Sequence, residues 1–363
     1  MKVAIIGGGA CGLVLARILE DNHISYEIFE KSLCGRKILA SGNGKANIGN
    51  TEILPIHYNH PFGYELVKTY YPKLIDFYKS IGLFTKTDEA GRIYPYSESS
   101  QTVLNCLNPA SLKIIENFVV EDISKINGRY YINGVRGPFD YIVLAVGSIA
   151  SFIKKKQEGF YHILDSFPLK QKPLAPSLVG FRLDCDFKRL AGVRFKCEAS
   201  LLQNGKVLHK EQGEVILKGD GISGICIMNL SSIYARLENK ENCNISLNLI
   251  PGMHFELSDK KELQGLIHPK LAEYFLQYSL SQIEELLTNF SFKILGVYDF
   301  EFAQVVSGGI AIDSITDELR LKQEPHILVG GEVLDIDGLC GGYNLMFAFC
   351  CGLKIGEVLC NIK

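Results

Sequence analysis

The chain has 363 residues, 47% hydrophobic and 21% charged, a composition typical of globular proteins that excludes intrinsic disorder, collagen and coiled coil. Its 38 Lys and Arg residues nearly balance its 40 Asp and Glu residues, for a formal net charge of −2. This balance gives no overall electrostatic reason to expect nucleic acid or an acidic membrane face as a partner. The length predicts two or three domains.

Targeting signals and cysteine usage predict a cytoplasmic protein. The N-terminal apolar run is short and passes into glycines with no cleavage site, so we expect no signal peptide, and no apolar segment reaches the ~20 residues that a bilayer requires. The eleven cysteines are scattered without C-x-x-C spacing, which favours reduced, mostly buried thiols over disulfides or zinc. We expect no metal site.

The first thirty residues predict a β-α-β unit. An apolar, β-branched run over 2–6 indicates a buried strand, and helical spacing over 13–19 follows a glycine-rich turn. A second strand over 26–30 ends at Glu30. About thirty residues is the size expected of such a unit.

The motif Gly7-x-Gly9-x-x-Gly12 joins this first strand to the helix. Gly7 permits the tight turn, Gly9 lets a pyrophosphate approach the backbone, and Gly12 allows close helix–strand packing. The helix N-terminus offers N–H donors and partial positive charge to phosphates. Glu30 follows Gly12 by 18 residues, where a carboxylate binds ribose hydroxyls and disfavours a 2′-phosphate. The motif predicts FAD or NAD rather than NADP.

Later elements predict an insert within this first domain. Helical spacing over 64–80 and a buried strand over 139–146 extend the first domain. From Pro173 the sequence alternates and carries turn signals, which indicates a β-rich region, and 258–290 is helical in texture. Residues 327–330 predict a last strand of the first domain, followed by a glycine-rich turn and a closing helix.

These elements predict an α/β fold with a discontinuous, Rossmann-like nucleotide-binding domain over 1–170 and 303–363. The inserted β-rich domain spans 171–302 and carries a helical subdomain over about 258–292. Whether the β-rich and helical parts form one domain or two stays open at this stage.

Two further segments suit contact with a polar ligand. Residues 35–50 contain Arg36 and Lys37 among glycines and asparagines. Such a loop either wraps an extended ligand through backbone N–H groups, Ser41 and Asn47, or lies in solvent.

The second segment, residues 330–343, again places glycines at a helix start. Asp335 and Asp337 either bind hydroxyls there or serve turns and helix caps. Cys340 raises the idea of a redox thiol, but without a C-x-x-C partner a buried, inert thiol is favoured.

The start, the 35–50 segment and the end together resemble the BaiN-like (YhiN-like) family of NAD(P)/FAD-dependent flavoproteins. This family has the glutathione-reductase-type FAD fold and overlaps with the aminoacetone oxidase family. Its second motif reads roughly GRKxxxSGxGRCNxTN, which the chain matches at Gly35, Arg36, Lys37, Ser41, Gly42, Gly44, Asn47 and Asn50. The chain departs from it at Lys45, Ala46 and Gly49. Further matching blocks are residues 91–100, 188–193, 213–224, 303–310 and 331–345.

The resemblance implies FAD on the first glycine motif, with its adenosine ribose on Glu30 and its flavin near the 35–50 and 331–345 segments. The cofactor-binding residues that it implies are Gly7, Gly9, Ala10, Cys11, Gly12, Glu30, Lys31, Arg36, Lys37, Ser41, Gly42, Gly44, Asn47, Val120, Ala145, Val146, Gly147, Gly331, Glu332, Asp335, Gly341, Gly342, Tyr343 and Asn344.

Several positions that differ from the family pattern are expected near the flavin: Lys45, Ala46, Val146, Met346 and Phe347. Val146 replaces a threonine, which costs one hydrogen bond of about 0.5–1.5 kcal/mol, so FAD binding should survive. Met346 and Phe347 replace a Gln-Trp pair. Together with Lys45 and Ala46, they are expected to alter substrate preference or the tightness of FAD binding more than the fold.

Residues 91–100 supply three substrate-side candidates. Arg92, Tyr94 and Ser97 either face the substrate, or Arg92 and Ser97 face solvent while Tyr94 packs. No catalytic side chain is assigned, because in flavin enzymes the cofactor carries the electrons.

The leading hypothesis is an FAD-dependent oxidoreductase that passes hydride from NAD(P)H through FAD to a small organic acceptor. No second complete GxGxxG unit is evident, so NAD(P)H is expected to bind only transiently. The alternatives are an FAD-dependent oxidase of small amines that uses oxygen, an RNA-related flavoprotein and a non-catalytic FAD-binding module. We expect a small-molecule substrate, with neither a nucleic-acid nor a membrane partner.

Overall fold

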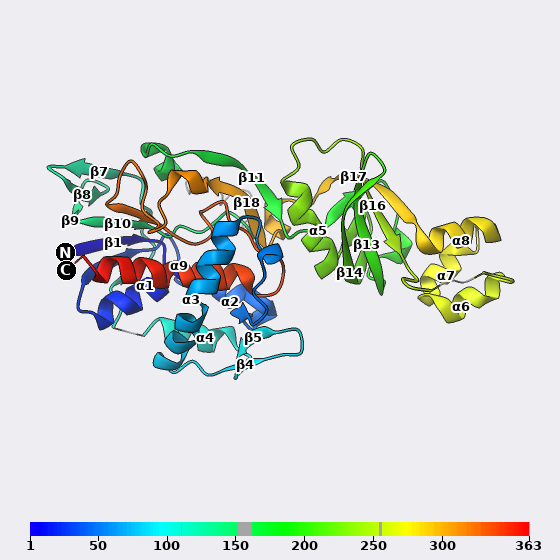
Figure 1. The fold of residues 1–363 in the computed structure, drawn as a ribbon, viewed down its shortest axis with the longest axis horizontal. Helices are drawn as coiled ribbons and strands as arrows, with labels where there is room; N and C mark the ends of the chain where they lie inside the picture. Colours follow the sequence, from blue (N-terminus) through cyan, green and yellow to red (C-terminus); the bar gives the residue numbers. More distant parts are fainter. Residues whose placement is uncertain (110, 152–161, 254–255, 363) are drawn as a thin grey trace. The chain divides into compact units, whose positions relative to one another are not determined.

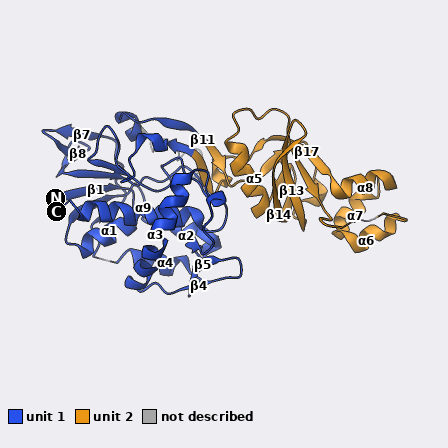
Figure 2. Ribbon diagram, viewed as in Figure 1, with its two compact units in different colours: residues 1–174, 308–363 blue, residues 175–307 orange. Residues whose placement is uncertain are grey.

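The computed structural model describes residues 1–109, 111–151, 162–253 and 256–362. The chain divides into two compact units, Met1–Leu174 with Gly308–Lys363 and Ala175–Ser307 (Figure 2). The chain passes from one unit to the other within two strands, β11 (Gln171–Ser177) and β18 (Val305–Ile310), which pair in a two-stranded sheet. The boundaries therefore fall a few residues beyond 170 and 302, inside strands, where composition does not change.

A five-stranded parallel sheet forms the centre of the first unit. The order is β19-β10-β1-β2-β6, with bounds Ile327–Val329, Tyr141–Leu144, Lys2–Ile6, Ser25–Phe29 and Ile114–Ile115. The four apolar residues of β1 are all buried, as expected for a parallel strand covered on both faces.

Helices α1 (Ala10–Asp21) and α9 (Tyr343–Cys360) pack against each other beside this sheet (Figure 1). Two glycines of α9 make the approach close: a Cβ at Gly352 would lie 2.7 Å from the carbonyl oxygen of Cys11, and one at Gly356 would lie 2.8 Å from the Ile18 side chain. By length and composition α9 could cross a membrane, but most of it is buried within this unit. Helices α2 (Arg36–Ala40), α3 (Pro61–Ser80) and α4 (Ser100–Leu107) also belong to this unit.

Two small antiparallel sheets complete the first unit. One has the order β3-β5-β4, with bounds Gly49–Asn50, Arg92–Pro95 and Thr85–Thr87. The other has the order β7-β8-β9, with bounds Ile123–Ile126, Arg129–Ile132 and Arg136–Phe139. Phe139 packs edge-on against Phe29 of β2 at 5.9 Å. The strand predicted over 139–146 is observed over Tyr141–Leu144, because Phe139 already belongs to β9. A continuous apolar run does not show where one strand ends and the next begins.

Six antiparallel strands close a barrel in the second unit. The order is β12-β15-β14-β13-β16-β17, with bounds Phe181–Leu183, Gly221–Ser223, Lys206–Lys218, Arg194–Gln203, Cys243–Asn248 and Phe290–Val297. Closure removes every unpaired strand edge from this unit's main sheet. Helix α5 (Ile225–Ala235) packs on β14 and β13.

The helical segment between β16 and β17 contains α6 (Leu263–Leu266), α7 (Pro269–Phe275) and α8 (Leu280–Thr288). It ends earlier than the expected residue 292, because Phe290 already pairs with Leu247 of β16. The predicted fold class, a Rossmann-like α/β domain with a β-rich insert that carries helices, is confirmed.

Candidate functional site

The three glycines of the first motif have three different surroundings. A Cβ at Gly7 would lie 2.3 Å from the carbonyl oxygen of Ala145, and one at Gly12 would lie 2.0 Å from that of Gly7. A Cβ at Gly9 would meet nothing within 4 Å, and Gly9 has an unstrained φ of −89°. Two of these glycines are therefore required by packing, and the third borders open space at the start of α1.

The N-terminus of α1 suits an anion. Gly9 is its N-cap, no side chain caps it, and its first turn contains no acidic residue. The N–H groups of this 12-residue helix therefore lack a side-chain acceptor beside the space at Gly9, and they carry partial positive charge. Ala10 begins the helix. The side chain of Cys11 is buried, and burial raises the pKa of its thiol well above the usual range, so only its backbone suits ligand contact.

The carboxylate of Glu30 is held at the end of β2 by neighbouring backbone. Its Oε2 accepts the N–H of Gly8 at 2.9 Å, and its Oε1 accepts the N–H and hydroxyl of Ser32 at 2.9 and 3.1 Å. A carboxylate has about four acceptor positions, so this one retains capacity for ribose hydroxyls. A Cβ at Gly8 would lie 2.2 Å from Sγ of Cys34, so this residue, which the motif leaves unspecified, is also required.

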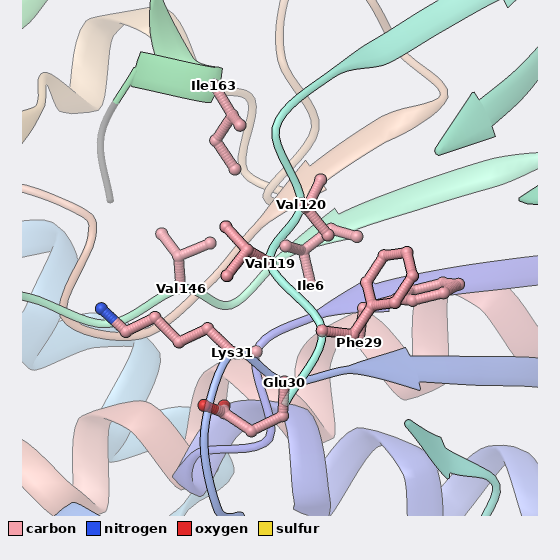
Figure 3. Close-up of a pocket in the computed structure, with 10 residues that line it drawn as sticks. Ile6, Phe29, Glu30, Lys31, Val119, Val120, Val146 and Ile163 are labelled. Atoms are coloured by element: carbon pink, nitrogen blue, oxygen red, sulfur yellow. The ribbon is translucent and has the colours of Figure 1, made fainter. Parts of the chain in front are cut away.

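A pocket with largely apolar walls lies beside Glu30. Figure 3 shows Val119, Val120 and Val146 grouped at its centre, with the Glu30 carboxylate below them and the Lys31 ammonium to the left. Its full lining is Ile6, Gly7, Phe29, Glu30, Lys31, Phe118, Val119, Val120, Val146 and Ile163. An apolar slot next to a carboxylate with free acceptor positions has the chemistry that an adenosine group requires. Sequence reasoning missed Phe118 and Val119, which lie on an irregular segment with no periodic pattern.

Lys31 lines this pocket, and two more cationic residues, Arg36 and Lys37, follow it in the chain. Burial lowers the pKa of Lys31 from 10.5 to about 8, and the charges of Arg36 and Lys37 act in the same direction, whereas Glu30 opposes them. Arg36 and Lys37 therefore lie within electrostatic reach of Lys31. A diphosphate between Gly9 and these residues would find both helix N–H donors and positive charge.

Lys37 joins three segments that are distant in sequence. Its Nζ lies 2.8 Å from Oγ of Ser148, which follows β10, and 2.8 Å from Oε2 of Glu332, which follows β19. Oε1 of Glu332 is buried and accepts no hydrogen bond from the described residues. A buried oxygen of this kind fits a ligand hydroxyl. Sequence reasoning missed Ser148, although it lies only two residues beyond Val146.

The segments that follow two neighbouring strands, β10 and β19, lie at the carboxyl edge of the parallel sheet. Ala145 closes on Gly7, Val146 lines the pocket, and Gly147 has a φ of +71° with open space at its Cβ position. Gly331 follows β19 with a φ of +81° and would place a Cβ 3.3 Å from that of Cys11. Carboxyl ends of parallel strands are where open α/β sheets bind ligands.

The 41–50 loop packs against the start of α9. The Ser41 hydroxyl donates to the carbonyl of Ile38, so its side chain closes α2. Gly42 and Gly44 have φ of +56° and +84°. Oδ1 of Asn47 is buried without a hydrogen bond from the described residues, and a Cβ at Gly342 would lie 2.4 Å from it.

Asn50 secures this contact and was not predicted as a site residue. It is buried, and its Nδ2 donates to the carbonyl of Gly341 at 3.1 Å. Gly341 and Gly342 have φ of +143° and +97°, which place the N-terminus of α9 beside the 41–50 loop. The signal in the sequence was the final asparagine of the GRK motif.

The side chains of Tyr343 and Asn344 are engaged within the protein. The Tyr343 hydroxyl donates to the carbonyl of Glu52 at 3.0 Å, and its ring lies 4.4 Å from that of His57. Asn344 accepts from the N–H of Gly338 and donates to its carbonyl, both at 2.8 Å. Only the backbone of these two residues is therefore available for ligand contact.

The family model described as HI0933-like protein Rossmann domain matches residues 1–358. The chain belongs to this family. The resemblance expected from the sequence is confirmed, and it places the chain among FAD-dependent oxidoreductases.

Two relatives match nearly end to end. A 3-dehydro-bile acid delta(4,6)-reductase of Clostridium scindens is 29% identical, over 98% of this chain and 98% of the relative. A ribosomal RNA dihydrouridine synthase of Haemophilus influenzae is 25% identical, over 97% of this chain and 98% of the relative. Among solved structures, the open conformation of a flavocytochrome c3 fumarate reductase matches with a TM-score of 0.50 and 12% identity, over 99% of this chain and 78% of that one; it shows the fold alone.

Two substrate-side candidates of this HI0933-like chain are paired within the protein. Arg92 Nε lies 2.8 Å from Oδ2 of Asp88, and the Ser97 hydroxyl donates to Thr102 at 2.8 Å. Tyr94 is half-buried on β5 and pairs with β4. Ser97 is exposed, and Arg92 is half-buried.

Met346 and Phe347, the two residues expected to depart from a Gln-Trp pair, are buried. Met346 and Phe347 are 0% and 2% exposed. Met346 packs near Gly49, and Phe347 lies against Tyr58. Any effect on a ligand therefore passes through the backbone that they support rather than through direct contact.

Proposed function

We propose that this chain binds FAD in the crevice at Gly9 and reduces a carbon–carbon double bond conjugated with a carbonyl, with NAD(P)H as the hydride donor. The observation that carries the cofactor assignment is the contrast among the glycines: Gly7 and Gly12 are filled by protein, and only Gly9 borders open space at an uncapped helix start.

The described residues supply a matching group for each part of FAD. The pocket beside Val120 would receive the adenine, and the Glu30 carboxylate the ribose hydroxyls. The α1 N-terminus and the nearby cations would hold the diphosphate. Oε1 of Glu332 and Oδ1 of Asn47 are acceptors for the hydroxyls and N–H groups of the remaining part.

When bound, FAD supplies a carrier that takes two electrons from a donor and gives them to an acceptor. The chain's own residues orient it and exclude water from its buried part. A carboxylate at Glu30 accepts hydrogen bonds from ribose hydroxyls and disfavours a 2′-phosphate, which suits FAD in this position. NAD(P)H has no second glycine motif here and would bind only during hydride transfer.

The substrate class rests on the two relatives. Their names both describe reduction of a carbon–carbon double bond next to a carbonyl, in a 3-oxo bile acid and in the uracil ring of RNA. The greater identity, 29% against 25%, and the net charge of −2 favour a small molecule. Reduction of uridine in RNA is the second candidate, supported by the match over 97% of the chain.

The first experiment is an absorption spectrum of the purified protein, followed by identification of the flavin that denaturation releases. Flavin reduction by NADH and by NADPH is then measured without oxygen, and reoxidation is followed with a 3-oxo-4,6-diene steroid and with a uridine-containing RNA. We expect FAD and rapid reoxidation by the steroid. Reoxidation by RNA alone would select the second candidate, and peroxide release from amines would favour an oxidase. A colourless protein that takes up no FAD would refute the proposal.

A further inference from the structure

Asp335 lies three residues beyond Glu332, and its carboxylate is engaged by the chain itself. Oδ1 accepts the N–H of Gly308 at 3.1 Å, and Oδ2 lies 2.8 Å from Nζ of Lys172. The Asp335 side chain is 4% exposed, whereas that of Lys172 is 59% exposed. A largely buried carboxylate thus holds one group from each of the two strands β18 and β11.

The backbone around this carboxylate is closely packed. A Cβ at Gly308 would lie 2.1 Å from the carbonyl oxygen of Pro173 in β11, and one at Gly309 would lie 2.5 Å from that of Val333. The N–H of Ile310 donates to Val333 at 2.9 Å. Residues 333–335 therefore run alongside β18, which pairs with β11, so the three chain segments lie side by side.

The same short segment carries Glu332, which binds Lys37 through one oxygen and leaves the other buried and available. A shift of the segment at Asp335 would displace Glu332, because only two residues separate them. The contacts of Asp335 therefore influence the position of Oε1 of Glu332, the acceptor proposed for FAD, without touching the ligand.

We propose that Asp335 and Lys172 are positioning residues that hold the Glu332 segment against strands β11 and β18 and thereby raise the affinity for FAD. The proposal rests on the proposed FAD binding and deepens it. Because linkage is reciprocal, FAD binding in turn stabilises the β11–β18 pair.

The test measures FAD affinity and hydrogen exchange rather than turnover. FAD is titrated into the apoprotein of the wild type, Asp335→Asn, Lys172→Met and the double variant, with flavin fluorescence as the readout. Asp335→Asn keeps an oxygen for the N–H of Gly308, removes the charge and replaces the acceptor of Lys172 by an NH2 group. Lys170→Met is the matched control, because Lys170 neighbours the same strand and forms an exposed pair with Asp313 at 3.1 Å.

We expect affinity about fivefold or more lower in both single variants, no further loss in the double variant, and a change below about twofold in Lys170→Met. Lys172→Arg should restore the affinity. FAD should slow amide exchange over residues 305–310 in the wild type and the control, and much less in the two variants.

Wild-type affinity in Lys172→Met and Asp335→Asn, or equal FAD protection of residues 305–310 in every variant, would overturn the proposal. Additive losses in the double variant would also overturn it. If Asp335→Asn does not fold, the FAD affinities of Lys172→Met and Lys172→Arg test the proposal. Failure of the wild type to bind FAD would instead refute the proposed function.

Discussion

The ammonium of Lys37 lies 2.8 Å from Oε2 of Glu332, although 295 positions separate the two residues. The pair joins the segment after β19 to the start of α2, and the Ser148 hydroxyl, which follows β10, also accepts a hydrogen bond from Lys37. Its side chains are 35% and 17% exposed, so the pair is partly shielded from solvent.

Lys37→Met should destabilise the protein by about 1–3 kcal/mol, because the largely buried Glu332 carboxylate loses its cation. The combined variant with Glu332→Gln should recover part of this loss, because the uncompensated charge is then gone. Urea unfolding of the two single variants and the double variant measures the coupling. A loss of stability in the double variant equal to the sum of the losses in the two single variants would contradict a direct interaction.

Gly9→Val and Gly12→Ala should separate ligand binding from folding. Gly9→Val should abolish FAD retention and leave the apoprotein folded, because its side chain enters open space where the pyrophosphate is expected. Gly12→Ala should lower the free energy of unfolding by about 1–3 kcal/mol, because its Cβ would meet the Gly7 carbonyl at 2.0 Å. Flavin content and urea unfolding are the measurements. A Gly9→Val protein with stoichiometric FAD would contradict the assigned site.

FAD affinity should fall as the pH rises above about 8. Lys31 has a pKa of about 8 in the folded protein, so it loses its charge there, and an anionic diphosphate prefers the charged form. Above this pH, FAD binding is coupled to the uptake of one proton by Lys31, so the affinity falls by at most about tenfold per pH unit. FAD titrations at several pH values should show this loss in the wild type and a flatter profile in Lys31→Met.

The stability of the apoprotein should change with pH in the opposite direction. Between about pH 8 and 10.5 the unfolded chain binds a proton at Lys31 that the folded protein has released, so the free energy of unfolding rises with pH in that window. Lys31→Met should remove this contribution. Equal slopes in wild type and variant over that window would show that Lys31 does not titrate as assigned.

Tyr343→Phe should cost about 0.5–1.5 kcal/mol of stability and leave FAD retention nearly unchanged. The variant removes the hydroxyl that donates to the carbonyl of Glu52, whereas the backbone at the start of α9 stays in place. Thermal unfolding and flavin content measure the two effects. Loss of FAD without loss of stability would mean that the hydroxyl itself contacts the cofactor.

The sequence by itself determined the β-α-β start, the roles of Gly7 and Gly12 and the place of Glu30. These features depend on spacing within about thirty residues, and local spacing follows directly from strand and helix geometry. The family assignment also came from the sequence, because its motifs run in order along the chain.

Only the tertiary structure decided which polar side chains meet. It brought Lys37 to Ser148 and Glu332, turned the Asp335 carboxylate toward Lys172, and engaged the Tyr343 hydroxyl within the protein. It also closed the alternating strands of the insert into a barrel. Such contacts join residues far apart in the chain, and their partners are set by the packing of whole elements rather than by any local pattern.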